Sequence, residues 1–265
     1  MKKLFLAFLF LAFSVLCGGE KFAPVVTIPG ELDTITGHVQ GICASNDALY
    51  LSHQKGIVKL DWSGRVIRHV PAPDHTGDIC FYNGKIYSAI AYYDHRRGKG
   101  AIKEYSADLD ELRTLELDFP SDGITVLNGF LYFGVGPNPA VLHRGNRLAR
   151  TPLALSGKIT FIKIDHGYPT RFGTQAITTC GNFLIATFYG GKNTRNTAIF
   201  DADGKLIQAL NFNAGMGFTA LPERFKTETP VFLRLRPLYN AKKKERPRVS
   251  FDFYALRDGK LVRLK

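Results

Sequence analysis

Residues 74–89 constrain the fold of this chain more than any other stretch, because their pattern recurs along the sequence. They read as a short apolar strand, the turn Asn83-Gly84 and a second strand in which apolar and polar residues alternate. An Asn-Gly pair accepts the positive φ angles of a two-residue turn, so the unit predicts a tight β-hairpin. The same pattern lies 37 residues earlier, and its matching pairs are His38 and His75, Ile42 and Ile79, and Tyr50 and Tyr87.

Two further copies follow in phase with these. Each copy has an isoleucine that is followed seven positions later by Leu or Ile, and the four isoleucines are Ile42, Ile79, Ile124 and Ile177. They are separated by 37, 45 and 53 residues, and a degenerate fifth copy starts at residue 215. Strand-built repeats of this period are typical of propeller blades. We therefore predict an all-β protein, a β-propeller of five four-stranded blades.

The turn signals between the repeats predict where the strands of each blade lie. In blades one and two we expect strands at 39–44, 48–53, 56–60 and 65–70, and at 78–82, 85–91, 101–105 and 112–117. In blade three we expect 123–127, 130–134, 141–143 and 147–151, followed by an extra strand at 158–164. Blades four and five follow at 175–179, 183–188, 197–201 and 206–210, and at 217–221, 231–236, 248–254 and 261–264. A strand at 24–28 either closes the ring by completing the last blade or packs elsewhere.

Residues 1–19 have the layout of a bacterial secretory signal peptide, with Lys2 and Lys3, then an apolar stretch, then Gly18 and Gly19. The apolar stretch is too short to favour a membrane-spanning helix, so we expect an exported protein, periplasmic or extracellular. An alternative is a lipoprotein anchored through Cys17. Residues 20–265 then form one β-propeller domain, since a chain of this length with 45 % hydrophobic residues can bury a full core.

The chain is strongly basic, with a formal net charge of +12. Lys2 and Lys3 leave with a signal peptide, which reduces this charge to about +10 in the mature chain. Such a surface favours anionic partners: acidic glycans, phosphorylated ligands or anionic lipid surfaces. Nucleic acid is not expected as a partner of an exported protein, and no transmembrane helix is expected in the mature chain.

Three cysteines remain after signal cleavage: Cys43, Cys80 and Cys180. Cys43 and Cys80 occupy matching places on the first strands of neighbouring blades, so a disulfide between them is geometrically conceivable in an oxidising compartment. The alternative, which we favour, is that both are small buried residues of a tightly packed inner layer. The sequence contains no Cys-x-x-Cys pair for a structural zinc site.

In a propeller the first strand of each blade lines the central axis, and its N-terminal end opens on one face. We call that opening the axial mouth, and we expect it to be ringed by His38, Gln40, His75, Asp78, Asp122 and Gln175. The same face receives the loop 92–100, which is basic and aromatic and supplies Tyr92, Arg96 and Arg97 as further ligand-binding candidates. Aromatic rings beside cations suit sugar rings that carry carboxylate or sulfate.

The axial mouth admits several chemistries. His38, His75, Asp78 and Asp122 are candidates for one divalent metal ion, since His and Asp are common metal ligands. His75 and Asp78 are candidates for general acid–base catalysis, with the carboxylate holding the imidazole tautomer. Alternatively, the histidines only hydrogen-bond neighbouring backbone. The sequence contains no Gly-x-Ser-x-Gly elbow, phosphate loop or dinucleotide fingerprint.

The repeats resemble the NHL, YVTN and gluconolactonase-like group of bacterial β-propellers, and the resemblance covers roughly residues 37–210. It rests on the Gly-Ile start of the first strand, the Leu-Tyr second strand and the Asp-x-x-Gly outer turn. More narrowly, His38-Val39-Gln40-Gly41 and His75-Thr76-Gly77-Asp78 are similar to blade starts in exported bacterial propellers. Gluconolactonase-like enzymes hold a divalent ion with Glu, Asn and Asp on the axis, whereas the matching positions here carry His, Gln and Asp.

Two functions follow as hypotheses. In the first, the exported propeller binds a ligand or an envelope protein partner, anionic or carbohydrate-like, through its basic, His-rich face. In the second, it is a lactonase-like hydrolase or lyase, dependent on a metal or on His and Asp, that acts on a sugar-derived or anionic substrate. His75 and Asp78 are then the acid–base candidates, and His38, Gln40, Asp122 and Gln175 position the substrate or metal.

Overall fold

The elements of the protein are β-strands separated by Gly- and Asn-containing turns, as the alternating sequence pattern predicts. The computed structural model describes residues 25–27, 39–73, 75–92, 94–136, 145–190, 196–222, 229–237 and 248–264. Within these ranges there is no helix that is long and apolar enough to cross a membrane. The residues of the expected signal peptide lie outside the described ranges.

The strands form five antiparallel sheets, one for each blade. Blade one contains β2 (Val39–Ala44), β3 (Leu49–His53), β4 (Gly56–Leu60) and β5 (Val66–Pro71). Blade two contains β6 (Thr76–Tyr82), β7 (Lys85–Ala91), β8 (Gly100–Ser106) and β9 (Glu111–Leu117). Blade three contains β10 (Ser121–Leu127), β11 (Phe130–Val135), β12 (Asn146–Pro152) and β13 (Thr160–Ile164), and blade four contains β14 (Gly173–Cys180), β15 (Phe183–Tyr189), β16 (Thr197–Phe200) and β17 (Leu206–Leu210).

Blade five is completed from both ends of the chain. Its strands are β18 (Phe218–Ala220), β19 (Val231–Pro237) and the ten-residue β20 (Arg248–Arg257). One half of the outer edge of β20 pairs with β1 (Val25–Thr27), and the other half pairs with β21 (Lys260–Arg263). The N-terminal strand therefore closes the ring, as one of the two sequence-based alternatives expected, and it shares the fourth position with the C-terminal strand.

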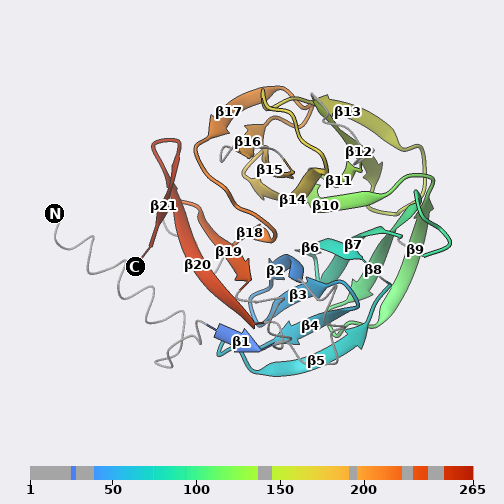
Figure 1. Ribbon diagram of the computed structural model, residues 1–265. Helices are drawn as coiled ribbons and strands as arrows, with labels where there is room; N and C mark the ends of the chain where they lie inside the picture. Colours follow the sequence, from blue (N-terminus) through green and yellow to red (C-terminus); the bar gives the residue numbers. More distant parts are fainter. Residues whose placement is uncertain are drawn as a thin grey trace.

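The five first strands surround one axis, so the predicted five-bladed β-propeller is confirmed (Figure 1). Strands β2, β6, β10, β14 and β18 contact one another in that order, and β18 returns to β2. Because each first strand descends from the same face, the N-terminal ends of all five meet there and form the axial mouth. The opposite face, which we call the turn face, carries the short turns between the first and second strands and between the third and fourth.

The predicted strands of blade three require a correction. Residues 147–151 belong to the third strand, β12, and the segment predicted as an extra strand contains the fourth, β13. The third strand was predicted at 141–143, which lies outside the described residues. The misassignment arises because a third strand at 141–143 puts 147–151 in the fourth position, so that the segment that contains β13 becomes an addition.

The core lies between neighbouring blades, since each blade is a sheet that packs both of its faces. One cluster joins blades one and five through Ile42, Leu51, Leu233 and other residues, and equivalent clusters join the remaining neighbours around the ring. The expected turn has the positive φ angles that a hairpin needs, at Asn83 (48°) and Gly84 (74°), and the equivalent Asn-Gly turn of blade three has them at Asn128 (51°) and Gly129 (78°).

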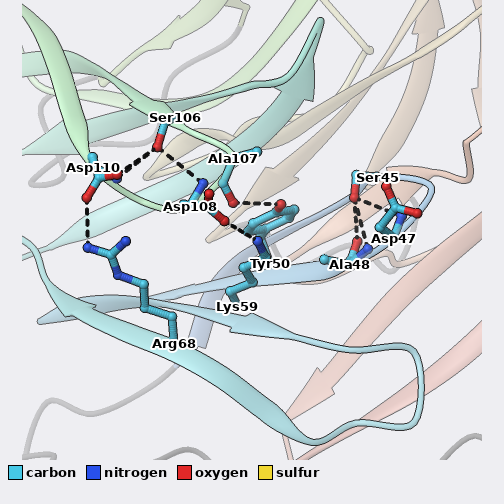
Figure 2. A network of polar contacts seen from close by, with 10 residues as sticks. All are labelled: Ser45, Asp47, Ala48, Tyr50, Lys59, Arg68, Ser106, Ala107, Asp108 and Asp110. Carbon is cyan, nitrogen blue, oxygen red and sulfur yellow. Dashed lines mark hydrogen bonds and ion pairs between the residues drawn. The ribbon is translucent and has the colours of Figure 1, made fainter.

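Polar contacts on the turn face fix blade one to blade two (Figure 2). Tyr50 donates its hydroxyl to the carbonyl of Ala107 at 3.0 Å. Lys59 and Arg68 form ion pairs of 2.7 and 2.8 Å with Asp108 and Asp110. The carboxylates lie close together in the β8–β9 turn, whereas their partners lie on β4 and β5, so these contacts tie the turn to the outer half of blade one.

Cys43 and Cys80 are buried free thiols, and Cys180 is a partly buried one. Burial raises the pKa of the Cys43 and Cys80 thiols well above the ordinary value. The two residues pack among apolar side chains of the inner layer, which is the alternative that the sequence favoured over a disulfide.

Candidate functional site at the axial mouth

A β-bulge interrupts the N-terminal end of the first strand in blades one to four. The register shifts between Val39 and Gly41, Thr76 and Ile79, Asp122 and Ile124, and Thr174 and Ala176. A bulge bends the strand and changes the direction in which a side chain points. The predicted mouth residues Gln40, Asp78, Asp122 and Gln175 lie within or next to these bulges, so the backbone irregularity and the polar side chains coincide.

Asp78 is the innermost of these residues and is 1 % exposed. Its Oδ2 accepts hydrogen bonds from the backbone N–H groups of Ile124 (3.1 Å) and Ile177 (3.0 Å), which belong to blades three and four. One carboxyl group of blade two therefore holds the first strands of two other blades. Burial raises the pKa of Asp78 well above its ordinary value, and these N–H groups oppose the rise.

The axis has room for the Asp78 side chain because the matching positions on its neighbours carry Gly41, Gly123 and Ala176. A Cβ atom on Gly41 would lie 2.6 Å from the Cα of Asp78, which is closer than real Cβ contacts. The close approach of blades one and two around Asp78 thus depends on the missing side chain of Gly41.

Asp122 is the carboxyl group nearest to solvent at the axial mouth. Its Oδ2 accepts a hydrogen bond from Nε2 of Gln175 at 3.1 Å, and its carboxyl also accepts the backbone N–H groups of Asp78 and Gly123. Burial raises the pKa of Asp122 to about 7, and the hydrogen bonds reduce that rise. A carboxyl group that is half protonated near neutral pH is suited to acid–base chemistry.

His75 lies beside Asp122, with 3.9 Å between Nε2 and Oδ2 of Asp122. The two side chains are 16 % and 11 % exposed, so both reach the surface of the mouth. His75 has a φ of 61°, a left-handed conformation that only a few per cent of non-glycine residues adopt. Two backbone bonds hold it there, from His75 N–H to the carbonyl of Gln54 (2.9 Å) and from Ala91 N–H to the carbonyl of His75 (3.3 Å).

The structure therefore brings together four of the six predicted mouth residues: His75, Asp78, Asp122 and Gln175. Gln40 is buried at the matching bulge of blade one, 3 % exposed, and His38 lies outside the described residues. The predicted pairing of His75 with Asp78 is replaced by a pairing of His75 with Asp122, because Asp78 points to the axis and its Oδ2 bonds backbone N–H groups.

The described mouth residues do not by themselves form a group that could hold a divalent cation. In the described part of the chain, no three His, Cys, Asp or Glu side chains gather in a way that could hold a metal ion, and His75, Asp78 and Asp122 form no such group. Asp78 Oδ2 and Asp122 Oδ2 already accept hydrogen bonds from N–H donors. A metal site formed by His38, His75, Asp78 and Asp122 stays a prediction, because His38 lies outside the described residues.

Three buried polar atoms near the mouth have no hydrogen-bond partner among the described residues: Asp78 Oδ1, Gln54 Oε1 and Thr174 Oγ1. Buried polar groups are nearly always paired, so unpaired ones mark places where a water molecule or a ligand atom completes the structure. Gln54 supplies the carbonyl that holds His75, and Thr174 directly precedes Gln175 in β14. The sequence places Gln54 only among the loops of this face, not in the cluster, and it gives no indication that Thr174, three residues before Ile177 as Thr76 is before Ile79, belongs to it.

In the described part of the basic loop, Tyr92 does not present its ring to solvent as a ligand-binding role predicts. Tyr92 is 3 % exposed, and the guanidinium of Arg96 lies 3.4 Å from the centroid of its ring. Arg96 also pairs with Asp94 at 2.8 Å, which lowers the pKa of that carboxyl group to about 2. A ligand would have to displace these contacts to use Tyr92 or Arg96, whereas Arg97 is exposed. No pattern in the sequence indicates that Tyr92, Asp94 and Arg96 satisfy one another.

No protein-family model matches the sequence, and no curated protein matches it. Solved structures do resemble its fold. The glutaminyl cyclase of Myxococcus xanthus has a TM-score of 0.59 at 10 % identity, with 89 % of this chain and 97 % of that chain covered. A mutant form of the GH43 protein BlXynB of Bacillus licheniformis has a TM-score of 0.55 at 14 % identity, covering 90 % and 56 %. The hydrazine synthase of Kuenenia stuttgartiensis reaches 0.51 at 13 %, covering 89 % and 68 %.

At these identities the likeness shows the fold alone, a β-propeller. The narrower resemblance to the NHL, YVTN and gluconolactonase-like group is not confirmed by these comparisons. The site must therefore be interpreted from its own residues.

Proposed function

We propose that the protein binds a small polyhydroxylated, carbohydrate-like ligand at the axial mouth. The observation that carries the proposal is the convergence of His75, Asp122 and Gln175 at the surface end of the axis, where Asp122 Oδ2 lies 3.9 Å from His75 Nε2 and 3.1 Å from Gln175 Nε2. A carboxyl, an amide and an imidazole supply both donors and acceptors, which is what adjacent hydroxyl groups require. The unpaired oxygens of Asp78, Gln54 and Thr174 supply further acceptors beneath them.

The preference for an anionic ligand rests on the net charge of +12 and concerns the rim of the site, not its centre. The centre contains carboxyl and amide groups, which favour hydroxyls or amines over a second anion. An acidic sugar would place its hydroxyls at Asp122 and Gln175 and its acidic group toward exposed cations such as Arg97. Export of the protein through residues 1–19 is part of the same proposal and would expose this site to extracytoplasmic glycans.

A second candidate function is acid–base catalysis on the same class of ligand, as a hydrolase or lyase. It is favoured by the raised pKa of Asp122, about 7, beside a histidine in a strained left-handed conformation. Asp122 would exchange a proton with the substrate, and His75 would stabilise the charge that Asp122 gains or loses. The structural neighbours named as a glutaminyl cyclase and a GH43 protein are compatible with a catalytic propeller, but their low identity carries no reaction to this chain.

The test is a thermal-shift screen of neutral and acidic sugars, followed by calorimetric titration of each hit against matched variants. Gln175→Ala and His75→Asn should weaken binding at least about tenfold, since hydrogen bonds involving charged groups contribute about 1.5–3 kcal/mol. Asparagine tolerates the left-handed backbone of residue 75, so this change removes the imidazole without adding strain. Asp118→Asn is the control, because this carboxylate is 99 % exposed and belongs to none of the mouth contacts.

Binding and catalysis are separated by Asp122→Asn. Asparagine retains the acceptor for Gln175 but cannot exchange a proton, so a catalytic role predicts near-normal binding with turnover reduced about 10²–10⁴-fold. Hits that bind wild type, His75→Asn and Gln175→Ala equally well would show that the ligand binds elsewhere, and the proposed site would be wrong.

A further inference from the structure

Two aromatic side chains, Phe172 and Tyr189, lie exposed on the mouth face of blade four. They are 39 % and 43 % exposed, and their ring centroids are 5.3 Å apart with an angle of 31° between the ring planes. Tyr189 ends β15, and Phe172 directly precedes β14, the first strand of the blade. Two adjacent aromatic rings thus share one small area of surface, which single exposed apolar residues do not do.

The local backbone holds this pair in place. The N–H of Phe172 donates to the carbonyl of Tyr189 at 3.2 Å, so the two residues are joined across the strands. Gly190, with a φ of 84°, lies directly under the Phe172 ring: a Cβ atom there would be 2.5 Å from Cδ2 of Phe172. The ring therefore rests on bare backbone, which fixes its orientation while it stays exposed on the other side.

The pair is connected to the axial mouth by a single strand. Gly173 is the cross-strand partner of Tyr189, and Gln175 follows two residues later in β14. At about 3.3 Å per residue, Phe172 and Gln175 are separated by roughly 10 Å along the chain. Gln175 in turn donates to Asp122 at 3.1 Å. An extended ligand of two or three sugar rings can contact the aromatic pair and the Asp122 carboxyl at the same time.

Exposed aromatic residues on the turn face do not share these properties. Phe183 begins the same strand that Tyr189 ends and is equally exposed, at 42 %. Phe130 is 38 % exposed and lies under the guanidinium of Arg150, 5.1 Å from its ring centroid. Exposure alone is therefore not the signal. Of these four aromatic residues, Phe172 and Tyr189 are the two that combine a paired ring surface, a glycine support and a short path to the polar cluster.

We propose that Phe172 and Tyr189 form a stacking subsite for one sugar ring of an oligosaccharide whose neighbouring unit hydrogen-bonds Asp122 and Gln175. The inference rests on the proposed function and specifies its ligand as an oligosaccharide. A pyranose ring with equatorial hydroxyls presents a face of axial C–H groups, and this apolar face packs on an aromatic ring. Phe and Tyr provide such contact area with little loss of side-chain freedom on binding.

The test measures binding of glucose, N-acetylglucosamine and galacturonic acid, each as monosaccharide, disaccharide and tetrasaccharide, by calorimetric titration. Variants are Phe172→Ala, Tyr189→Ala, Tyr189→Phe and, as the matched control from the opposite end of the same strand, Phe183→Ala. We expect at least one oligosaccharide to bind tenfold or more weakly to Phe172→Ala and Tyr189→Ala, and unchanged to Tyr189→Phe and Phe183→Ala. The matching monosaccharide should depend on Gln175 and not on the aromatic pair.

Parallel titrations of Gln175→Ala distinguish the two proposals. Oligosaccharide binding that is weakened by Gln175→Ala but not by Phe172→Ala or Tyr189→Ala overturns the stacking subsite and leaves the proposed function standing. Binding that depends on the aromatic residues and not on Gln175 overturns the connection to the axial mouth and the proposed function with it. If no saccharide of the series binds the folded wild-type protein, both proposals are wrong.

Discussion

Replacing Asp122 by asparagine should make the protein more stable at neutral and alkaline pH. Burial raises the pKa of this carboxyl from 3.8 to about 7, so the folded state holds its proton more tightly than the unfolded state. A raised pKa means that the stability contributed by the group is fully present below pH 3.8. It is lost as the pH rises through about 7, because the buried carboxyl must then ionise.

The magnitude follows from the same two values. The pKa of Asp122 differs by about 3 between the folded and unfolded states, and each pKa unit corresponds to about 1.4 kcal/mol. The wild type therefore loses about 4 kcal/mol of unfolding free energy when the pH rises above about 7. Asparagine is close in shape to the protonated carboxyl group and has no charge to bury. Asp122→Asn should therefore gain up to about 4 kcal/mol relative to wild type at pH 8.5 and much less at pH 4. The charge of Asp122 also raises the pKa of Asp78, so its removal acts in the same direction.

The assay is urea unfolding of both proteins at pH 4, 5.5, 7 and 8.5, followed by the fluorescence of Trp62, the single tryptophan. Asp118→Asn is the control, and its difference from wild type should stay within about 0.5 kcal/mol at every pH, as expected for an exposed site. If the difference between Asp122→Asn and wild type is constant across this range, the carboxyl has the same pKa in the folded and unfolded protein, and the assignment of its raised pKa is refuted. A polar residue whose replacement stabilises the protein is expected to serve function and not stability.

Three further predictions concern His53 at the end of β3, which lies against His69, and the inner-strand residues Asp78 and Gly41. His53 is 1 % exposed, and burial lowers its pKa to about 4. The stability that it contributes is therefore present above pH 6.5 and falls by about 3 kcal/mol as the pH decreases toward 4. His53→Gln should remove this part of the loss of stability at acid pH, measured by urea unfolding. Asp78→Ala leaves the N–H groups of Ile124 and Ile177 without their acceptor and should cost about 3 kcal/mol of unfolding free energy, against a smaller loss for Asp78→Asn. Gly41→Ala places a Cβ 2.6 Å from Asp78 Cα and should cost about 2 kcal/mol in the same assay; equal stability would show that blades one and two separate easily.

The blade architecture was predictable because it depends on local signals that repeat. Asn83-Gly84 and Asn128-Gly129 specify hairpins by their own conformational preferences, and the isoleucine that starts each copy fixes which residues face the axis. Blade three departed from the prediction where the signal weakens. Assigning the short apolar segment 141–143 to the third strand puts 147–151 in the fourth position, so the segment that contains β13 is left over.

The mouth cluster was predictable in part of its membership, namely His75, Asp78, Asp122 and Gln175, but not in its pairing. The phase of the repeat places His75, Asp122 and Gln175 at equivalent strand ends, and closure of the ring brings equivalent ends together. Which side chain meets which depends on the bulges, whose positions no local signal marks. Phe172 was missed because it precedes its strand and lies outside the repeated pattern. The position of its ring depends on the missing side chain of Gly190, which lies 18 positions further along the chain.

The most direct measurement of the axial mouth as a binding site is the pH dependence of ligand affinity. A hit from the sugar screen is titrated calorimetrically into wild type and Asp122→Asn at half-unit intervals from pH 5.5 to 8.5. If the ligand contacts Asp122, its affinity for the wild type should change with pH with a midpoint near pH 7, and its affinity for Asp122→Asn should not depend on pH in this range. The same pH profile in both proteins would contradict a ligand site at Asp122 and leave the cluster as a structural feature of the inner strands.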